Sequence, residues 1–253
     1  MLAIDTIYNW RILFSMGKRK LSTSPAGAAV TSKLAKVVRA TIPTNVTIPT
    51  ATTSSKDISS SSNKDSLPEL IRCSWGNSFK NPIYMTYHDK EWGKPCHDET
   101  QLFEMLILEG AQAGLNWETI LNKRENYRVA FDHWDVDCIS KYDDRKVEVL
   151  MANAGIVRNR LKIKATITNA VAYKELCKEH GSLDNYLWSH VPNRTPILSE
   201  TEERIVTSPL SDTISKDLKK RGFKFVGSTI IYAYLQAVGV VDDHDQNCAF
   251  RFK

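Results

Sequence analysis

Apolar side chains recur at helical spacing through most of the chain after about residue 67. Leu102, Leu106 and Ala113 share one face of a segment that opens at Asp98 and ends before Gly114. The opening residues Asp-Glu-Thr-Gln predict a capping box, and a glycine just past the last periodic position is a common helix stop. Because strict two-residue alternation is not found over any long run, the pattern predicts an all-α domain.

Two further segments have the same periodicity. A second helix is predicted over residues 153–173, and a third over 228–238, where Gly239 ends it. Ser228 or Thr229 is placed to cap the third helix, since hydroxyl side chains accept hydrogen bonds from the first free backbone amides.

Glu109 is the residue that fits its surroundings least. It falls on the same helix face as Leu102 and Leu106, where a carboxylate costs free energy unless it is paired or lines a polar cavity. The plain alternative is that this face has an edge at which Glu109 reaches water. The aromatic residues near it in sequence are Trp75, Tyr84, Tyr87, Trp92 and Trp117. Aromatic rings with one acid suit a pocket for a flat, electron-poor ring, although aromatic residues alone are more often core.

The positive net charge belongs to the N-terminal part of the chain. Residues 1–65 hold nine of the 34 basic and three of the 29 acidic residues, which leaves 25 basic and 26 acidic residues for 66–253. A surface that binds nucleic acid would therefore have to be a local basic patch, because the rest of the chain is close to neutral. Residues 1–66 are Ser/Thr-rich and basic, and we expect a disordered tail ahead of a folded domain over 67–253.

The composition also limits where the protein works. Five cysteines without close pairing favour a reducing compartment, and no apolar run is long enough to span a membrane. If the source is eukaryotic, the tail predicts a nuclear protein through Lys18-Arg19-Lys20, with a mitochondrial or plastid transit peptide, or a tail without an address, as alternatives. We expect a monomer.

Many segments together resemble the 3-methyladenine DNA glycosylase I family. Their order and spacing match from about Arg72 to Cys248, which is nearly the whole predicted domain. The segments are Cys73-Ser-Trp75, Tyr84–Gly93, Leu102–Met105, Leu108–Trp117, Lys123–Arg128, Ala154–Arg158 and Lys219–Gly227. The resemblance implies a helix-hairpin-helix DNA glycosylase fold with a structural zinc site.

The resemblance also assigns zinc ligands to Cys73, His88, His244 and Cys248. Two thiolates and two imidazoles suit a closed tetrahedral zinc site. The spacing alone is weak support, because Cys73 and His88 are 15 residues apart and a single histidine is usually just hydrogen-bonded. The remaining cysteines have no assigned role, and Asp243 is expected to brace the site without acting as a catalyst.

Matching to the family places a substrate pocket at the aromatic residues. Glu109 corresponds to the acid that binds the adenine edge, and Trp75, Tyr84, Tyr87 and Trp117 to rings that line or stack on the base. The residues expected to touch DNA are Gly114 and Leu115, which fill the gap left by the flipped nucleotide, and Gly222, Lys224, Gly227 and Ser228 of the hairpin.

The resemblance implies a DNA repair glycosylase that acts on double-stranded DNA with alkylated adenine and hydrolyses the N-glycosidic bond of 3-methyladenine. Because Ser228, Thr229 and Ile230 stand where bifunctional relatives carry a lysine, we expect no strand cleavage. Two basic clusters, at 216–224 and 158–164, could contact phosphates or could be ordinary solvated helix faces. The alternative functions are a zinc-stabilised DNA-binding module without catalysis and a helical scaffold that binds protein.

Overall fold

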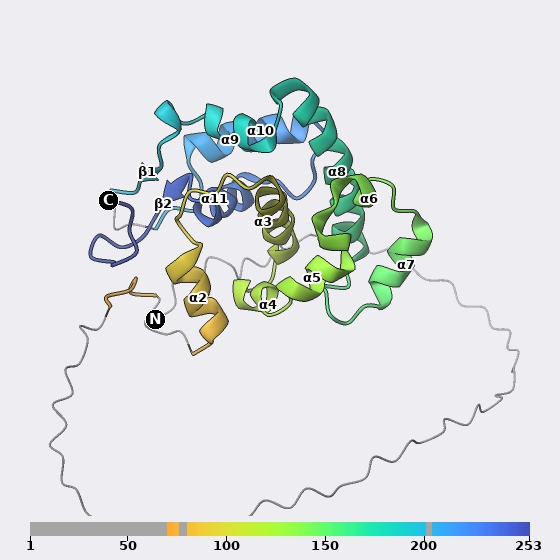
Figure 1. The fold of residues 1–253 in the computed structure, drawn as a ribbon, viewed down its shortest axis with the longest axis horizontal. Coiled ribbons are helices and arrows are strands. Elements are labelled where there is room, and N and C mark those ends of the chain that lie inside the picture. The colour runs from red at the N-terminus through yellow and green to blue at the C-terminus, as the bar shows by residue number, and fades with distance from the viewer. Residues whose placement is uncertain (1–69, 76–79, 201–203) are drawn as a thin grey trace, which may run out of the picture. The chain divides into compact units, whose positions relative to one another are not determined.

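The computed structural model describes residues 70–75, 80–200 and 204–253, which are mostly helical (Figure 1). The elements are α2 (Pro82–Lys90), α3 (Glu99–Gln112), α4 (Trp117–Leu121), α5 (Arg124–Ala130), η2 (Asp132–Trp134), α6 (Val136–Ile139), α7 (Asp144–Ala152), α8 (Arg160–His180), α9 (Leu183–Ser189), η3 (Pro192–Arg194), β1 (Ile197–Leu198), α10 (Pro209–Lys220), α11 (Ser228–Ala237) and β2 (Val241–Asp242). Within these ranges no helix is both long and apolar enough to cross a membrane. The predicted tail, residues 1–66, lies outside the described residues.

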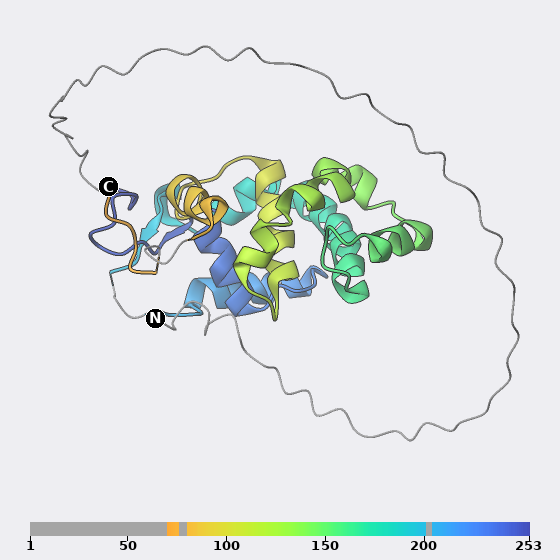
Figure 2. The same ribbon diagram turned by 90° about the horizontal axis from the view of Figure 1, so that it is seen from below.

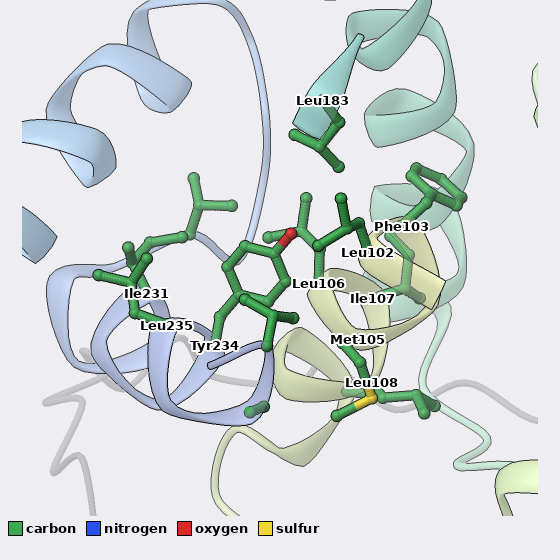
Figure 3. Packing of buried hydrophobic residues seen from close by; sticks show 14 of the residues in the cluster. Leu102, Phe103, Met105, Leu106, Ile107, Leu108, Leu183, Ile231, Tyr234 and Leu235 are labelled. Atoms are coloured by element: carbon green, nitrogen blue, oxygen red, sulfur yellow. The ribbon is translucent and has the colours of Figure 1, made fainter. Parts of the chain in front are cut away.

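Helix α3 is the centre of the core. Every residue from Leu102 to Gln112 is buried, and the helix contacts α11, α8, α9 and α4. Figures 1 and 2 both show α3 with α11 on one side and α8 on the other. In Figure 3, Tyr234 of α11 lies against Leu106, below Leu183 of α9. A helix that is covered on all sides can be apolar all round, so the polar residues within it stand out.

The start of α3 confirms half of the predicted capping box. The Asp98 carboxylate accepts a hydrogen bond from the Gln101 amide at 2.7 Å, as an N-cap should. The Gln101 side chain instead donates to Glu91 Oε2 at 3.5 Å, so the return bond of a capping box is replaced by a contact with the chain ahead of the helix. Gly114, with φ +78°, ends the helix as predicted.

The second predicted helix was wrong at both ends. Residues 153–159 form a turn in which Asn153 Oδ1 accepts from the Gly155 amide at 2.8 Å. Helix α8 begins at Arg160, because the Asn159 side chain caps it by accepting from the amides of Leu161 and Lys162, and it continues to His180 before stopping at Gly181. The periodic apolar residues continued through a turn, which periodicity alone cannot separate from a helix.

Helices α10 and α11 pack side by side and are joined by a short hairpin, residues 221–227. The N-cap of α11 is Gly227, so the prediction of a Ser228 or Thr229 cap was wrong. Ser228 is the first helical residue, and its hydroxyl bonds the Ser211 hydroxyl of α10 at 2.8 Å. The sheet of the described residues is one parallel pair, with Ile197 opposite Val241, so the prediction of a helical domain is confirmed.

The two ends of the described chain are joined. Ala249 N donates to Ile71 O at 2.8 Å, and the Asp245 amide donates to Cys73 Sγ at 3.3 Å. The segment that carries Trp75 is therefore held against the C-terminal segment after β2. This junction lies beside α2 and places the predicted site residues of both segments within reach of each other.

Candidate active site and metal centre

A cavity of about 670 Å³, including its open mouth, lies between α2, α3, α4 and α11. It contains the acid and all four rings that the sequence had assigned to a substrate pocket. Its lining residues are Trp75, Tyr84, Tyr87, Trp92, Glu109, Trp117, Arg204, Ile205, Val206, Thr229, Tyr232, Ala233, Gln236 and Asp243. We call this space the aromatic cavity.

Glu109 is 3% exposed and lies in the wall of the aromatic cavity. Burial raises the pKa of its carboxyl group from 4.5 to about 8. The group therefore carries a proton at neutral pH in the free protein. Among the described residues its Oε2 atom has no hydrogen-bond partner, and neither does the indole nitrogen of Trp117. Two buried polar groups in one cavity wall are suited to a polar ligand.

The rings are set by the starts of two short helices. Asn81 accepts from the Ile83 amide at 2.9 Å and begins α2, which places Tyr84 and Tyr87 one turn apart. Asn116 accepts from the Thr119 amide at 2.8 Å and begins α4 at Trp117. In both cases an Asx cap fixes where the aromatic side chains leave the backbone.

The ring geometry excludes a base sandwiched between Tyr87 and Trp117. Their centroids are 5.5 Å apart and their planes are tilted by 53°, so the rings already contact each other. A flat ligand can lie against this pair but not between its members. Also in the cavity lining, the Trp75 ring lies 6.0 Å from the Tyr84 ring and packs edge-on to Trp92 at 4.9 Å.

Sequence reasoning missed the wall that α11 supplies. Thr229, Tyr232, Ala233 and Gln236 stand at positions i, i+3, i+4 and i+7, so they share the helix face turned to the aromatic cavity. The signal was available, since Gln236 is a polar residue in a strongly apolar helix, as Glu109 is. Asp243 accepts a hydrogen bond from Gln236 Nε2 at 2.7 Å, which supports the expected bracing role.

The four predicted metal ligands converge beside the aromatic cavity. Cys73, His88, His244 and Cys248 are all buried, and one ligand atom from each lies within 4.8 Å of the others. They come from the first described segment, from α2 and from the C-terminal segment, so a bound ion would join parts of the chain about 170 residues apart. Burial raises the pKa of the Cys73 thiol far above its ordinary value, a penalty that a cation would offset.

Both histidines are oriented by carboxylates. His88 Nδ1 is 2.8 Å from Asp89 Oδ1, and His244 Nδ1 is 2.6 Å from Asp242 Oδ1. These bonds leave Nε2 of each ring for a metal, and His244 Nε2 is buried without a hydrogen-bond partner among the described residues. Histidines that bind zinc commonly donate their other ring nitrogen to a carboxylate, which fixes the orientation of the ring. The residues present therefore fit a zinc ion.

The family model described as methyladenine glycosylase matches residues 75–252. The chain belongs to the methyladenine glycosylase family. It is 45% identical over 181 residues to DNA-3-methyladenine glycosylase 1 of Escherichia coli (strain K12), a match that covers 71% of this chain and 96% of that protein.

Solved structures of family members agree with this assignment. A crystal structure of 3-methyladenine DNA glycosylase I is 43% identical and superposes with a TM-score of 0.68, covering 72% of this chain and all of that one. The enzyme from Staphylococcus aureus, in a study of 3-methyladenine recognition, is 36% identical with a TM-score of 0.68 and covers 72% and 97% of the two chains. The similarity of this chain to these solved structures therefore extends over most of the described residues.

The residues predicted to contact DNA lie at two turns. Gly114 is exposed with φ +78°, and Leu115 is half-buried beside it. Gly222 has φ +97°, Lys224 is exposed, and a Cβ on Gly227 would meet no atom of the protein within 4 Å. The conformations at 114 and 222 require glycine, whereas at 227 neither the backbone nor the described neighbours require it.

Four of the nine cations in the two expected basic clusters turn inward or pair at the surface. Arg160 and Lys164 form ion pairs with Glu148 and Asp144. Arg221 pairs with Glu179 and with Asp217. Lys162 bonds backbone carbonyls of α3. These four cations are occupied by the fold, so we no longer expect them to form the main phosphate-binding surface.

Proposed function

We propose that this methyladenine glycosylase removes 3-methyladenine from double-stranded DNA by hydrolysing its N-glycosidic bond after the nucleotide has been flipped out of the helix. The observation that supports this most directly is Glu109, a fully buried carboxyl group with an unpartnered oxygen inside an aromatic cavity. The family members compared above, which are named for this activity, are 36–45% identical to the chain over the matched residues. An extrahelical base is the kind of flat ligand that such a cavity accepts.

The cavity favours a positively charged base by two electrostatic effects. Methylation at N3 of adenine in DNA places a positive charge on the ring and weakens the bond to the sugar. The faces of Tyr87 and Trp117 attract such a ring by ~0.5–2 kcal/mol per good contact, an attraction that neutral adenine lacks. Glu109 loses its proton when the cation enters, and the resulting ion pair holds the base edge in a site with little water.

Cleavage of the N-glycosidic bond needs little acid catalysis, because the leaving 3-methyladenine already carries a positive charge in DNA. The enzyme's task is to extrude the nucleotide, hold the base and let water attack the sugar carbon. Trp75 and Tyr84 also line the cavity and would exclude solvent from the base. Asp243 is bonded to Gln236, so its role in this scheme is to fix that side chain.

We assign the grip on DNA to a helix-hairpin-helix formed by α10, the 221–227 hairpin and α11. The amino end of α11 has free backbone amides and a positive dipole end, which attract a phosphate. Gly227 leaves open space there, so a phosphate can approach the backbone, with Ser228 and Lys224 beside it. Gly114 and Leu115 enter the gap in the base stack, where an apolar side chain offsets lost stacking.

The four-residue cluster of Cys73, His88, His244 and Cys248 would hold a structural zinc ion. The ion supplies no step of the reaction in this proposal and instead closes the domain by joining its two ends. The carboxylates of Asp89 and Asp242 orient the two imidazoles toward it. In purified protein we expect about one zinc per chain by metal analysis; a preparation that is folded and active without metal would contradict the assignment.

The enzymatic proposal is tested by incubating the protein with duplex DNA treated with a methylating agent. We expect free 3-methyladenine to be released. The strand should stay intact at the abasic site, because Ser228, Thr229 and Ile230 directly follow Gly227, where a lyase would carry its lysine. Retained DNA binding without base release would favour a non-catalytic module. Trapping of a covalent adduct by borohydride would contradict the absence of lyase activity.

A further inference from the structure

Lys162 of α8 is bonded to the carboxyl end of the helix that carries Glu109. Its ammonium group donates to Ala111 O and to Ala113 O, both at 2.7 Å. The last carbonyls of a helix have no partners within the helix and form the negative end of its dipole. A partly buried ammonium placed there satisfies two carbonyls and adds a favourable charge interaction.

The turn that follows is the one expected to enter the DNA. Ala113 leaves helical geometry, Gly114 has φ +78°, and the Leu115 amide donates to Gln112 O at 2.6 Å. We call residues 113–115 the gap turn. Because Lys162 binds Ala113 O within it and Ala111 O just before it, Lys162 fixes the direction in which the chain leaves α3.

Asn169 makes a matching contact with the hairpin. Its Oδ1 accepts from the Lys224 amide at 2.7 Å, and its Nδ2 donates to Lys224 O at 3.0 Å. The side chain is 3% exposed, so both bonds are made in the protein interior. The next residue, Phe225, has φ +55°, an unfavourable conformation for a residue with a side chain, which such a clamp can hold in place.

Lys162 and Asn169 are seven residues apart, which is two helical turns, so they lie on one face of α8. The hairpin also packs directly on α3, three residues before the gap turn, since a Cβ on Gly110 would lie 3.2 Å from Phe225 Cβ. Neither residue lines the aromatic cavity. One helix face therefore connects the gap turn and the 221–227 hairpin without touching the base.

We propose that Lys162 and Asn169 are positioning residues that hold the gap turn and the hairpin in register, so that the phosphate grip and the filling of the base gap occur together on one duplex. This inference rests on the proposed function. It separates two steps that a glycosylase must combine: base binding in the aromatic cavity, which should not depend on this clamp, and nucleotide extrusion, which should.

The test compares Lys162→Met with Lys164→Met, a control on the exposed side of the same helix whose cation pairs with Asp144. For Lys162→Met we expect single-turnover excision from methylated duplex to fall by about tenfold to a hundredfold. Affinity for free 3-methyladenine, measured by quenching of the cavity tryptophans, should stay within about twofold of wild type. Lys162→Arg, which keeps two donors, should recover most of the loss, and Lys164→Met should excise as wild type does.

A second readout does not require excision. In a duplex with a tetrahydrofuran site next to 2-aminopurine, wild-type protein should change the probe's fluorescence as Leu115 enters the gap, and Lys162→Met and Asn169→Ser should lose this change. The inference would be overturned if the wild-type protein excises the base and Lys162→Met excises it equally well. It would also be overturned if Lys162→Met loses affinity for the free base as much as it loses excision. Absence of excision by wild type would count against the proposed function alone, since the probe still tests the clamp.

Discussion

Replacing Glu109 by glutamine should lower single-turnover excision of 3-methyladenine from duplex DNA by about a hundredfold or more. Glutamine keeps the shape and can still form hydrogen bonds, but it cannot become the anion that pairs with a cationic base. Release of the free base is measured by chromatography. Glu125→Gln, at an exposed glutamate of α5, is the matched control and should excise at the wild-type rate.

The same substitution should make the free protein more stable at neutral and alkaline pH. The pKa of Glu109 is raised from 4.5 to about 8 by burial, so the native state binds its proton more tightly than the unfolded chain. Stability should therefore fall as pH rises from about 4.5 through 8, by about 3 kcal/mol at pH 7. Urea unfolding at several pH values should show this slope in wild type and its loss in Glu109→Gln.

Two results would contradict this account of Glu109. Full excision by Glu109→Gln would show that no anion is needed at the back of the cavity. The carboxyl group would be better solvated than its burial indicates if the stability of the wild-type protein changes with pH between 5 and 8 no more than that of Glu109→Gln.

The second large effect is expected from Cys248→Ser. We expect the zinc content to fall from about one per chain to near zero, because the site is closed by four ligands and loses one of them. The melting temperature should fall by about 10 °C or more, because the bound ion stabilises the fold. Loss of the metal should also displace Trp75 in the wall of the aromatic cavity. Cys73 lies two residues before Trp75, and His88 packs edge-on to the Trp75 ring at 5.0 Å. Binding of free 3-methyladenine should therefore weaken with the loss of metal.

Cys138→Ser serves as the control for this experiment, because Cys138 is exposed and distant in sequence from the cluster. Metal analysis, thermal melting and tryptophan quenching are measured on both variants. A Cys248→Ser protein that keeps its zinc, or that loses it while binding the base as before, would contradict the proposed link between the metal centre and the aromatic cavity.

Sequence pattern was sufficient where local spacing decides the structure. Apolar spacing along the chain predicts a helical domain. Within α3, it also predicts where the helix starts and stops and shows that Glu109 falls on an apolar face. The convergence of Cys73 with Cys248 could not be obtained this way, because it depends on contact between the two ends of the described chain. There the family resemblance, not the spacing, named the four residues that the structure brings together.

Charge along the chain was the least reliable guide. A lysine or arginine in the sequence does not show its partner, and Lys162 and Arg221 proved to bond carbonyls or carboxylates of the fold. The wall from α11 was missed for a related reason. The polar Gln236 marks one face of an apolar helix, but only the packing of that helix against α3 shows that this face, with Tyr232, borders the cavity.

The central claim is that the aromatic cavity prefers a positively charged purine to a neutral one of the same shape. The most direct measurement is the affinity of the protein for 3,9-dimethyladeninium, a permanent cation whose N9-methyl group replaces the sugar, against neutral 9-methyladenine, both by tryptophan quenching. We expect the cation to bind at least about tenfold more tightly, with that preference lost in Glu109→Gln. Equal affinity for the two compounds in wild-type protein would contradict the account.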